Sequence, residues 1–128
     1  MNRKIILTGL SFGIIAIVLG AFGAHALKKV LPVNALATFE TGVKYQMYHA
    51  LFLLFLGLNN FTSLKTKKIL LILTIIGTFF FSGSIYLLAT DTLTSFDFKI
   101  IGFITPIGGL LLILAWIGLF LSILKNKS

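Results

Sequence analysis

Polar side chains that could do chemistry are scarce in this chain, and most of them lie toward one end of its apolar segments. Histidine can transfer protons or bind metals, and tyrosine, glutamine and glutamate can act with it through hydrogen bonds. His49 could form a proton relay with Tyr45, or a ligand site with His25. The candidate polar site comprises His25, Glu40, Lys44, Tyr45, Gln46, His49, Ser82, Ser84, Tyr86 and Thr105.

The alternative for His49 is a structural role, in which its ring nitrogens bond tyrosine and serine hydroxyls of neighbouring helices. We favour this alternative, because polar groups inside a membrane usually pair with one another. A metal site is not predicted, since the spacing of His25, Glu40 and His49 matches no metal-binding motif. The chain has no Cys and shows no Ser-His-Asp order, HExxH motif or phosphate-binding glycine loop. We therefore predict no cofactor and no enzymatic activity.

Helical spacing limits which of these groups can meet. At about 100° per residue, Gly42, Tyr45 and His49 share one face of a helix. Glu40 and Lys44 lie on the nearly opposite face, at the i,i+4 spacing of an ion pair. A straight helix therefore cannot turn both His49 and Glu40 toward one bundle interior, whereas a bend at Gly42 would allow it.

Four long apolar runs must position these groups. The composition is 58% hydrophobic and 11% charged, against about 25% charged residues in a typical soluble domain. Each run is long enough to cross a hydrocarbon core of about 30 Å, the second only just. The runs cover about residues 5–26, 45–61, 69–89 and 100–124. We therefore predict an all-α, integral membrane four-helix bundle, formed by a single transmembrane domain over residues 1–128.

The charged residues orient the predicted bundle. The N-terminus, the second connection and the C-terminus carry seven basic residues and no acidic residue, whereas the other two connections carry four basic and three acidic residues. Because basic loops stay on the cytoplasmic side, we predict that both termini are cytoplasmic in the plasma (inner) membrane. Trp116 then suits the inner interface. The net charge of +8 indicates membrane lipids as partners, and we predict no nucleic-acid binding.

The connection between the first two runs is the longest, and it ends in a helical pattern. Pro32 can begin a helix and Asn34 can cap it. The chain after them forms either one long helix into the second span or an amphipathic interfacial helix that bends near Gly42. In the fourth run, Pro106 either kinks a helix or marks its start with Thr105 as the cap.

The first run contains two further patterns. Ala24-His25-Ala26 mimics a signal-peptide cleavage site, but the run stays apolar beyond the usual signal length, so we expect it to be retained. A stripe of small residues would also let helices approach closely. It could mediate a homo-oligomer or contact with a partner membrane protein, although we favour contact within the chain. The stripe comprises Gly9, Gly13, Ala16, Gly20 and Ala24.

Four sequence blocks, in order along nearly the whole chain, resemble a known family. The two strongest are residues 20–27 (GAFGAHAL) and 39–51 (FETGVKYQMYHAL), followed by 81–86 (FSGSIY) and 105–109 (TPIGG). They are similar to the YgdD/YwdK-like group of small bacterial inner-membrane proteins, a domain-of-unknown-function family with an animal relative. The resemblance implies a four-span plasma-membrane protein and implies no reaction. Gly42 departs from the alanine expected there, which favours a bend.

These observations predict a non-catalytic membrane protein that binds a lipid or a partner helix through a polar site near the outer leaflet. The alternative is a small oligomeric transporter or proton-coupled carrier that uses His49 and Glu40. A carrier needs polar groups along both halves of one interface, and the inner half of this chain is mostly apolar with scattered threonines. An intramembrane enzyme ranks lowest, because no nucleophile is paired with a base.

Overall fold

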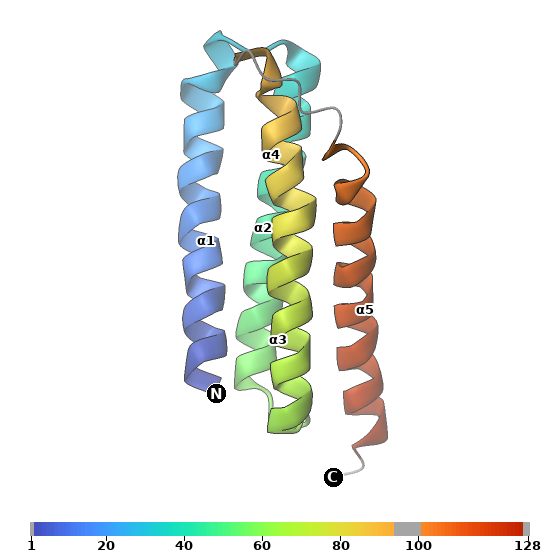
Figure 1. Cartoon of the computed structure of the whole chain (residues 1–128). Coiled ribbons are helices and arrows are strands. Elements are labelled where there is room, and N and C mark those ends of the chain that lie inside the picture. Colours follow the sequence, from blue (N-terminus) through green and yellow to red (C-terminus); the bar gives the residue numbers. More distant parts are fainter. Residues whose placement is uncertain (1, 94–100, 127–128) are drawn as a thin grey trace.

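The computed structural model describes residues 2–93 and 101–126, and within them it is helical throughout its regular elements. The long helices run side by side, with both chain ends at the same end of the bundle (Figure 1). The predicted all-α membrane bundle is confirmed. The elements are α1 (Asn2–His25), α2 (Val33–Leu58), α3 (Leu64–Thr78), α4 (Ser84–Ala89) and α5 (Ile104–Lys125), with 3-10 turns at Leu27–Lys29 and Asp91–Leu93.

The third rod contains a feature that the sequence pattern did not predict. A π-helical turn, Phe79–Gly83, joins α3 to α4, so that α3, the turn and α4 form one continuous rod (Figure 1). This α3–α4 rod, Leu64–Ala89, is long and apolar enough to cross a membrane, as are Asn2–Lys29 and Ile104–Lys125. The helix α2 contains the second predicted span, which stays a prediction. The predicted start of the fourth run, at residue 100, lies outside the described residues.

The helix α2 settles the alternatives left open for the first connection. It begins directly after Pro32, whose extended ψ of 157° turns the chain into the helix, and it continues without a break through Gly42. The first connection therefore leads into one long helix. Asn34 is not a cap, because it lies inside the first turn and Pro32 takes the capping position without a side-chain hydrogen bond. The fixed φ of proline favours that start.

The helix α5 settles the second pair of alternatives. It begins at Ile104, so Pro106 falls in the first turn, where its missing N–H leaves no helical hydrogen bond unmade. Pro106 thus marks a start and not a kink. Thr105 is not the cap, because Phe103 holds that position and makes no side-chain cap bond.

Small residues let α1 pack along α2. A Cβ added at Gly9 would come within 2.9 Å of the Ala50 carbonyl oxygen, and one at Gly23 within 3.2 Å of the Phe39 ring. Ala16 between them is buried. The contact within the chain that we favoured for this stripe is therefore confirmed, although its upper end is Gly23 and not the exposed Ala24.

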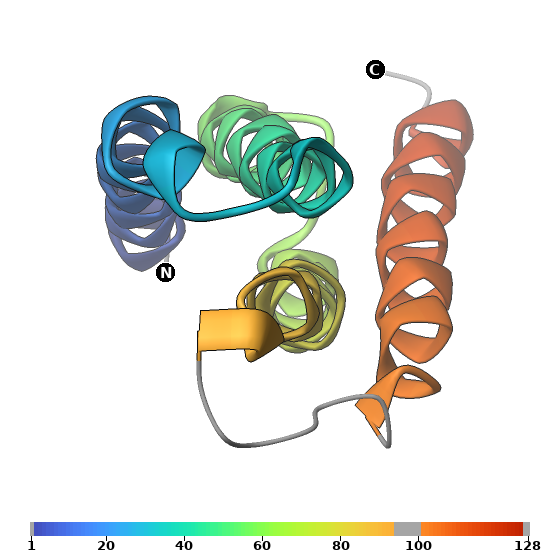
Figure 2. The same cartoon turned by 90° about the horizontal axis from the view of Figure 1, so that it is seen from above.

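The helix α5 packs against the α3–α4 rod, on the side away from α1 (Figure 2). Gly108 makes this possible, because a Cβ there would overlap the Phe81 backbone nitrogen and lie 2.7 Å from the Phe80 carbonyl carbon. Real Cβ atoms do not come so close. The backbone of α5 thus lies directly against the π turn.

Two apolar clusters stabilise the bundle, and the polar residues of interest lie between them. The upper cluster comprises Leu27, Leu31, Phe39 and Ala89. The lower cluster comprises Ile5, Phe52, Leu53, Leu56, Leu70, Ala115 and Leu119.

A buried lysine ties the lower end of the bundle together. Lys67 is only 2% exposed, and its Nζ donates to the carbonyl oxygens of Asn59 at 2.8 Å and Gly57 at 3.4 Å. It also donates to Oδ1 of Asn2 at 3.0 Å, at the start of α1. The last carbonyls of a helix have no partner within the helix. Lys67 therefore closes the C-terminal end of α2 and fixes it to α1.

Candidate functional site

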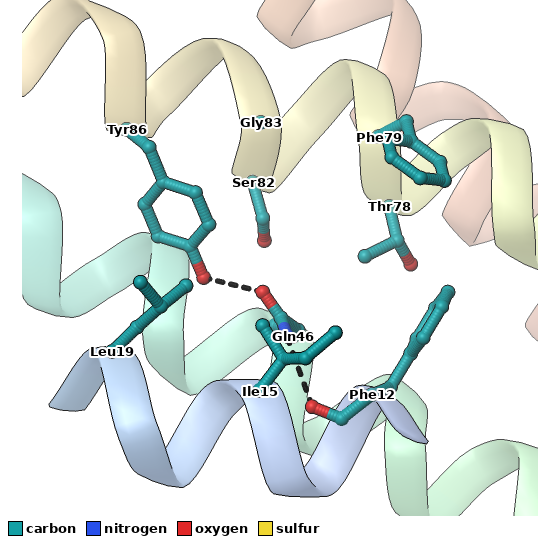
Figure 3. A pocket seen from close by; sticks show the side chains of 9 residues that line it. All are labelled: Phe12, Ile15, Leu19, Gln46, Thr78, Phe79, Ser82, Gly83 and Tyr86. Atoms are coloured by element: carbon teal, nitrogen blue, oxygen red, sulfur yellow. Dashed lines mark hydrogen bonds between the residues drawn. The ribbon is translucent and has the colours of Figure 1, made fainter. Parts of the chain in front are cut away.

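A cavity of about 240 Å³ lies between α1, α2 and the α3–α4 rod. Its walls are mostly apolar, and Figure 3 shows side chains from all three rods around it. We call it the central cavity. It is lined by Phe12, Ile15, Leu19, Gln46, Thr78, Phe79, Ser82, Gly83 and Tyr86.

Gln46 connects the three rods at this cavity. Its Nε2 donates to the Phe12 carbonyl oxygen of α1 at 2.9 Å. Its Oε1 accepts from the Tyr86 hydroxyl of α4 at 2.6 Å. Both bonds are drawn in Figure 3. Because Gln46 is only 5% exposed, these bonds form away from water and hold the amide in one orientation.

Ser82 and Gly42 bring the π turn against α2. The Ser82 hydroxyl donates to the Gly42 carbonyl oxygen at 2.7 Å. A Cβ at Gly42 would lie 2.7 Å from Cε1 of Tyr86. The glycine therefore provides space for the Tyr86 ring. The helix does not bend at Gly42. The bend expected there, because glycine replaces the alanine of the family, is therefore wrong.

The π turn also shapes the wall of the cavity. A Cβ built on Gly83 meets no atom within 4 Å, so the wall is open at this residue. One turn earlier, the Thr78 side chain is 6% exposed, and its Oγ1 has no hydrogen-bond partner among the described residues. Single π turns inside α-helices occur frequently at functional sites.

His49 lies on the other side of α2, in a groove that faces α5. Its Nδ1 is 2.7 Å from the Tyr45 carbonyl oxygen, and its Nε2 accepts from the indole N–H of Trp116 at 3.0 Å. A carbonyl can only accept and an indole can only donate. The contacts therefore assign the neutral tautomer with the proton on Nδ1. The favoured structural role of His49 matches this geometry, but its partners are a carbonyl and Trp116 instead of hydroxyls.

The groove beside His49 is wider and more open than the central cavity. One part, of about 670 Å³, is lined by Tyr48, Phe52 and Leu119 together with Tyr45, His49 and Trp116. A second part of about 430 Å³ is also lined by Tyr45, His49 and Trp116, and it extends to Phe81 and Gly109. This groove contains no acidic residue among those that line it.

The ten predicted site residues do not share one pocket. Gln46, Ser82 and Tyr86 line the central cavity, whereas Tyr45 and His49 line the groove toward α5. The Ser84 and Thr105 hydroxyls bond each other at 2.5 Å and join α4 to α5. The remaining three are exposed near the upper end: His25, Glu40 and Lys44.

Glu40 and Lys44, which have the spacing of an ion pair, are both exposed, and the structure gives no ion pair between these two described residues. No group of three or more metal-ligating side chains occurs among the described residues.

Two residues of these sites were missed or misplaced by the sequence analysis. Thr78 was not among the predicted site residues, yet it lines the same cavity as Ser82 and Tyr86. The spacing of four residues from Thr78 to Ser82 to Tyr86 was a usable signal. Trp116 had been considered only for the membrane interface, and the sequence analysis missed that its indole N–H bonds His49 of α2.

Comparison with known proteins defines the family. A family model described as "Protein of unknown function (DUF423)" matches residues 19–109. A UPF0382 membrane protein of Haemophilus influenzae is 37% identical over 127 residues, which cover 99% of this chain and 98% of the relative. YwdK, a UPF0382 membrane protein of Bacillus subtilis, is 36% identical over 96% of this chain and 98% of its own length.

A further relative, from Staphylococcus haemolyticus, is 42% identical over 106 residues and 83% of each chain. No solved structure matches this chain. The matched region contains the four sequence blocks that carry the family resemblance, together with most of the lining of the central cavity. The resemblance is confirmed, and the chain belongs to the DUF423 family.

Proposed function

We propose that this protein is a non-catalytic plasma-membrane protein that binds a membrane lipid in the central cavity. The observation that carries the proposal is the composition of the cavity wall. Apolar side chains of α1 and the α3–α4 rod surround a small set of buried polar groups that Gln46 holds in place. Binding sites for small apolar ligands are built in this way.

The size of the cavity favours a lipid over a partner helix. A helix with its side chains is about 10–12 Å across, whereas the cavity holds only about 240 Å³. This volume lies below the range of about 300–1,000 Å³ that is typical of complete ligand sites. One end of a lipid fits there, while the rest of the molecule extends between the rods into the bilayer.

The arrangement of His49 and Glu40 does not support the carrier alternative. Both ring nitrogens of His49 already have partners, and Glu40 is exposed. Glu40 does not line the central cavity or either part of the groove beside His49.

The proposal includes an orientation with both termini in the cytoplasm. The two chain ends lie at the same end of the bundle (Figure 1), and the exposed residues Arg3, Lys4 and Lys65 lie near that end. A reporter fused to the C-terminus should be active only when it is of a kind that works in the cytoplasm. Activity of a reporter that works only outside the membrane would overturn this orientation.

The experiment that tests lipid binding fills the cavity. Gly83→Ile adds a side chain where the wall is open, and Ala21→Ile adds the same side chain at an exposed position of α1. Each protein is purified in mild detergent, and the lipids that remain bound are identified by mass spectrometry. Wild type and Ala21→Ile should retain one enriched lipid class, and Gly83→Ile should lose it. Equal retention by all three, or bulk lipid alone in wild type, would refute the proposal.

A further inference from the structure

The hydroxyl of Thr78 differs from the other hydroxyls of its rod. On a helix, a serine or threonine hydroxyl commonly donates to the carbonyl four residues earlier. Thr74 does so at 2.8 Å and Ser84 at 2.5 Å. Thr78 is buried without any such partner among the described residues. Figure 3 shows its oxygen directed toward α1, into the space that the cavity occupies. This buried hydroxyl thus has hydrogen-bonding capacity that the described residues do not use.

The other polar groups of the cavity have already used most of their donors. The hydroxyl protons of Ser82 and Tyr86 go to the Gly42 carbonyl and to Gln46. The Gln46 amide has two protons, and the described residues accept one of them, through Phe12. The donors that remain are the Thr78 hydroxyl and the second amide proton of Gln46.

The Thr78 hydroxyl and the second amide proton of Gln46 both lack an acceptor among the described residues. A carbonyl oxygen has two lone pairs and can accept from two donors. Buried oxygen atoms with an unused lone pair are less rare in proteins than buried donors without an acceptor. The hydrogen bonding of the cavity is therefore best completed by a ligand that carries a carbonyl oxygen.

The absence of charge in the cavity lining and the depth of Thr78 restrict the chemical class of the ligand further. No charged side chain lines the cavity, and an unpaired charge is costly in the membrane interior. Thr78 lies near the middle of the 26-residue rod, which places it roughly 15–20 Å from each end at 1.5 Å per residue. A phosphate headgroup at the bilayer surface does not reach this depth. The carbonyl must belong to the apolar body of the ligand.

We propose that the central cavity binds a neutral, carbonyl-bearing lipid, whose carbonyl oxygen accepts hydrogen bonds from the Thr78 hydroxyl and the Gln46 amide. The carbonyl can come from the ring of an isoprenoid quinone or from a long-chain ester without a headgroup. This inference rests on the proposed lipid-binding function and specifies the ligand class of the same site.

The test compares probes that differ in the polar group. Purified full-length protein in detergent is titrated with a long-chain isoprenoid quinone, a wax ester, an isoprenoid alcohol and an isoprenoid hydrocarbon. We expect at least one of the two carbonyl probes to bind more tightly than the alcohol and the hydrocarbon. Whichever of the two binds more tightly identifies the source of the carbonyl. Tighter binding of the alcohol, or equal binding of the hydrocarbon, would overturn the inference.

Thr78→Val tests the hydrogen bond itself, with Thr74→Val as the matched control. Both changes replace a buried hydroxyl by a methyl group, but the Thr74 hydroxyl donates to the Leu70 carbonyl and does not line the cavity. Thr78→Val should weaken the carbonyl probe about 2- to 13-fold, the value of one hydrogen bond, and leave the hydrocarbon unchanged. Thr74→Val should leave both affinities unchanged.

The outcomes separate this inference from the proposed function. If Gly83→Ile abolishes lipid retention but Thr78→Val leaves the preference for carbonyl probes unaltered, the cavity binds lipid and the inference is wrong. If Gly83→Ile also has no effect, lipid binding at this cavity is itself refuted. Thermal unfolding without ligand adds a check: Thr78→Val should be at least as stable as wild type, since the hydroxyl has no partner to lose.

Discussion

Trp116 donates its indole N–H to Nε2 of His49 across 3.0 Å, and this bond joins α5 to α2. The two rings are nearly perpendicular, at 88°, with centroids 6.0 Å apart. Elsewhere α5 packs mainly against the α3–α4 rod. His49 therefore contributes to the position of α5, and the single tryptophan of the chain reports on that contact.

Replacing His49 should loosen this contact. His49→Leu removes the acceptor of the indole proton, so we expect the free energy of unfolding to fall by about 0.6–1.7 kcal/mol, the range for such bonds in membranes. The tryptophan emission should move to shorter wavelength. His25→Leu, at an exposed position, should change neither quantity. An unchanged emission spectrum in His49→Leu would contradict the contact.

The adjacent glycines Gly108 and Gly109 should respond differently to alanine. Gly108→Ala places a methyl group against the backbone of the π turn, whereas at Gly109 the nearest atom is 3.5 Å away, an ordinary contact. Overpacking of this kind costs about 1–3 kcal/mol. We expect Gly108→Ala to lower the unfolding temperature and Gly109→Ala to leave it almost unchanged. Equal effects would mean that α5 does not lie this close to the π turn.

Lys67 should matter for stability in a way that its neighbour does not. Lys67→Met leaves the Gly57 and Asn59 carbonyls without their ammonium donor, at a cost of about 1–3 kcal/mol. Lys68→Met removes the same charge from an exposed position, so the orientation signal of the loop changes equally in both variants. Unfolding measurements should show a loss only for Lys67→Met. A matching loss in Lys68→Met would show that net charge is the cause.

The bond between Tyr86 and Gln46 can be measured by removing the hydroxyl. Tyr86→Phe should lower the free energy of unfolding by about 0.6–1.7 kcal/mol, because the Gln46 amide loses its donor at 2.6 Å. Tyr48→Phe, at a ring that is 49% exposed, serves as the control. In a double-mutant cycle, Tyr86→Phe should have little further effect after Gln46→Leu. Additive losses would indicate that the two groups do not interact.

The fold was largely predictable because the solvent determines it. Long apolar runs with basic ends lead to helices across a membrane, and the close packing along Gly9 follows from the need of membrane helices for small residues. The sequence alone could not choose between a bend and a continuous helix at Gly42. That choice depends on the Tyr86 ring, which lies far away in the chain.

The candidate site was only partly predictable. Gln46, Ser82 and Tyr86 were selected because polar groups are rare inside apolar runs, and the structure places them together. Their separation from His49 follows from the position of α2 between two neighbours, which no local pattern contains. The role of Thr78 depends on a side-chain orientation, and the role of Trp116 depends on how α5 packs. Both are tertiary features.

The π turn at Phe79–Gly83 determines how a change in the number of residues would affect the register of the α3–α4 rod. A π turn contains about one residue more than an α turn, so it shifts the angular phase of everything that follows by about 100°. If the same residues formed a regular α-helix instead, Tyr86 would rotate away from Gln46 and Ser84 away from Thr105. Deleting one residue within the π turn would therefore restore a regular helix and keep the register of the α3–α4 rod with both neighbours, whereas an added residue would have to be accommodated in the same way by a second wide turn.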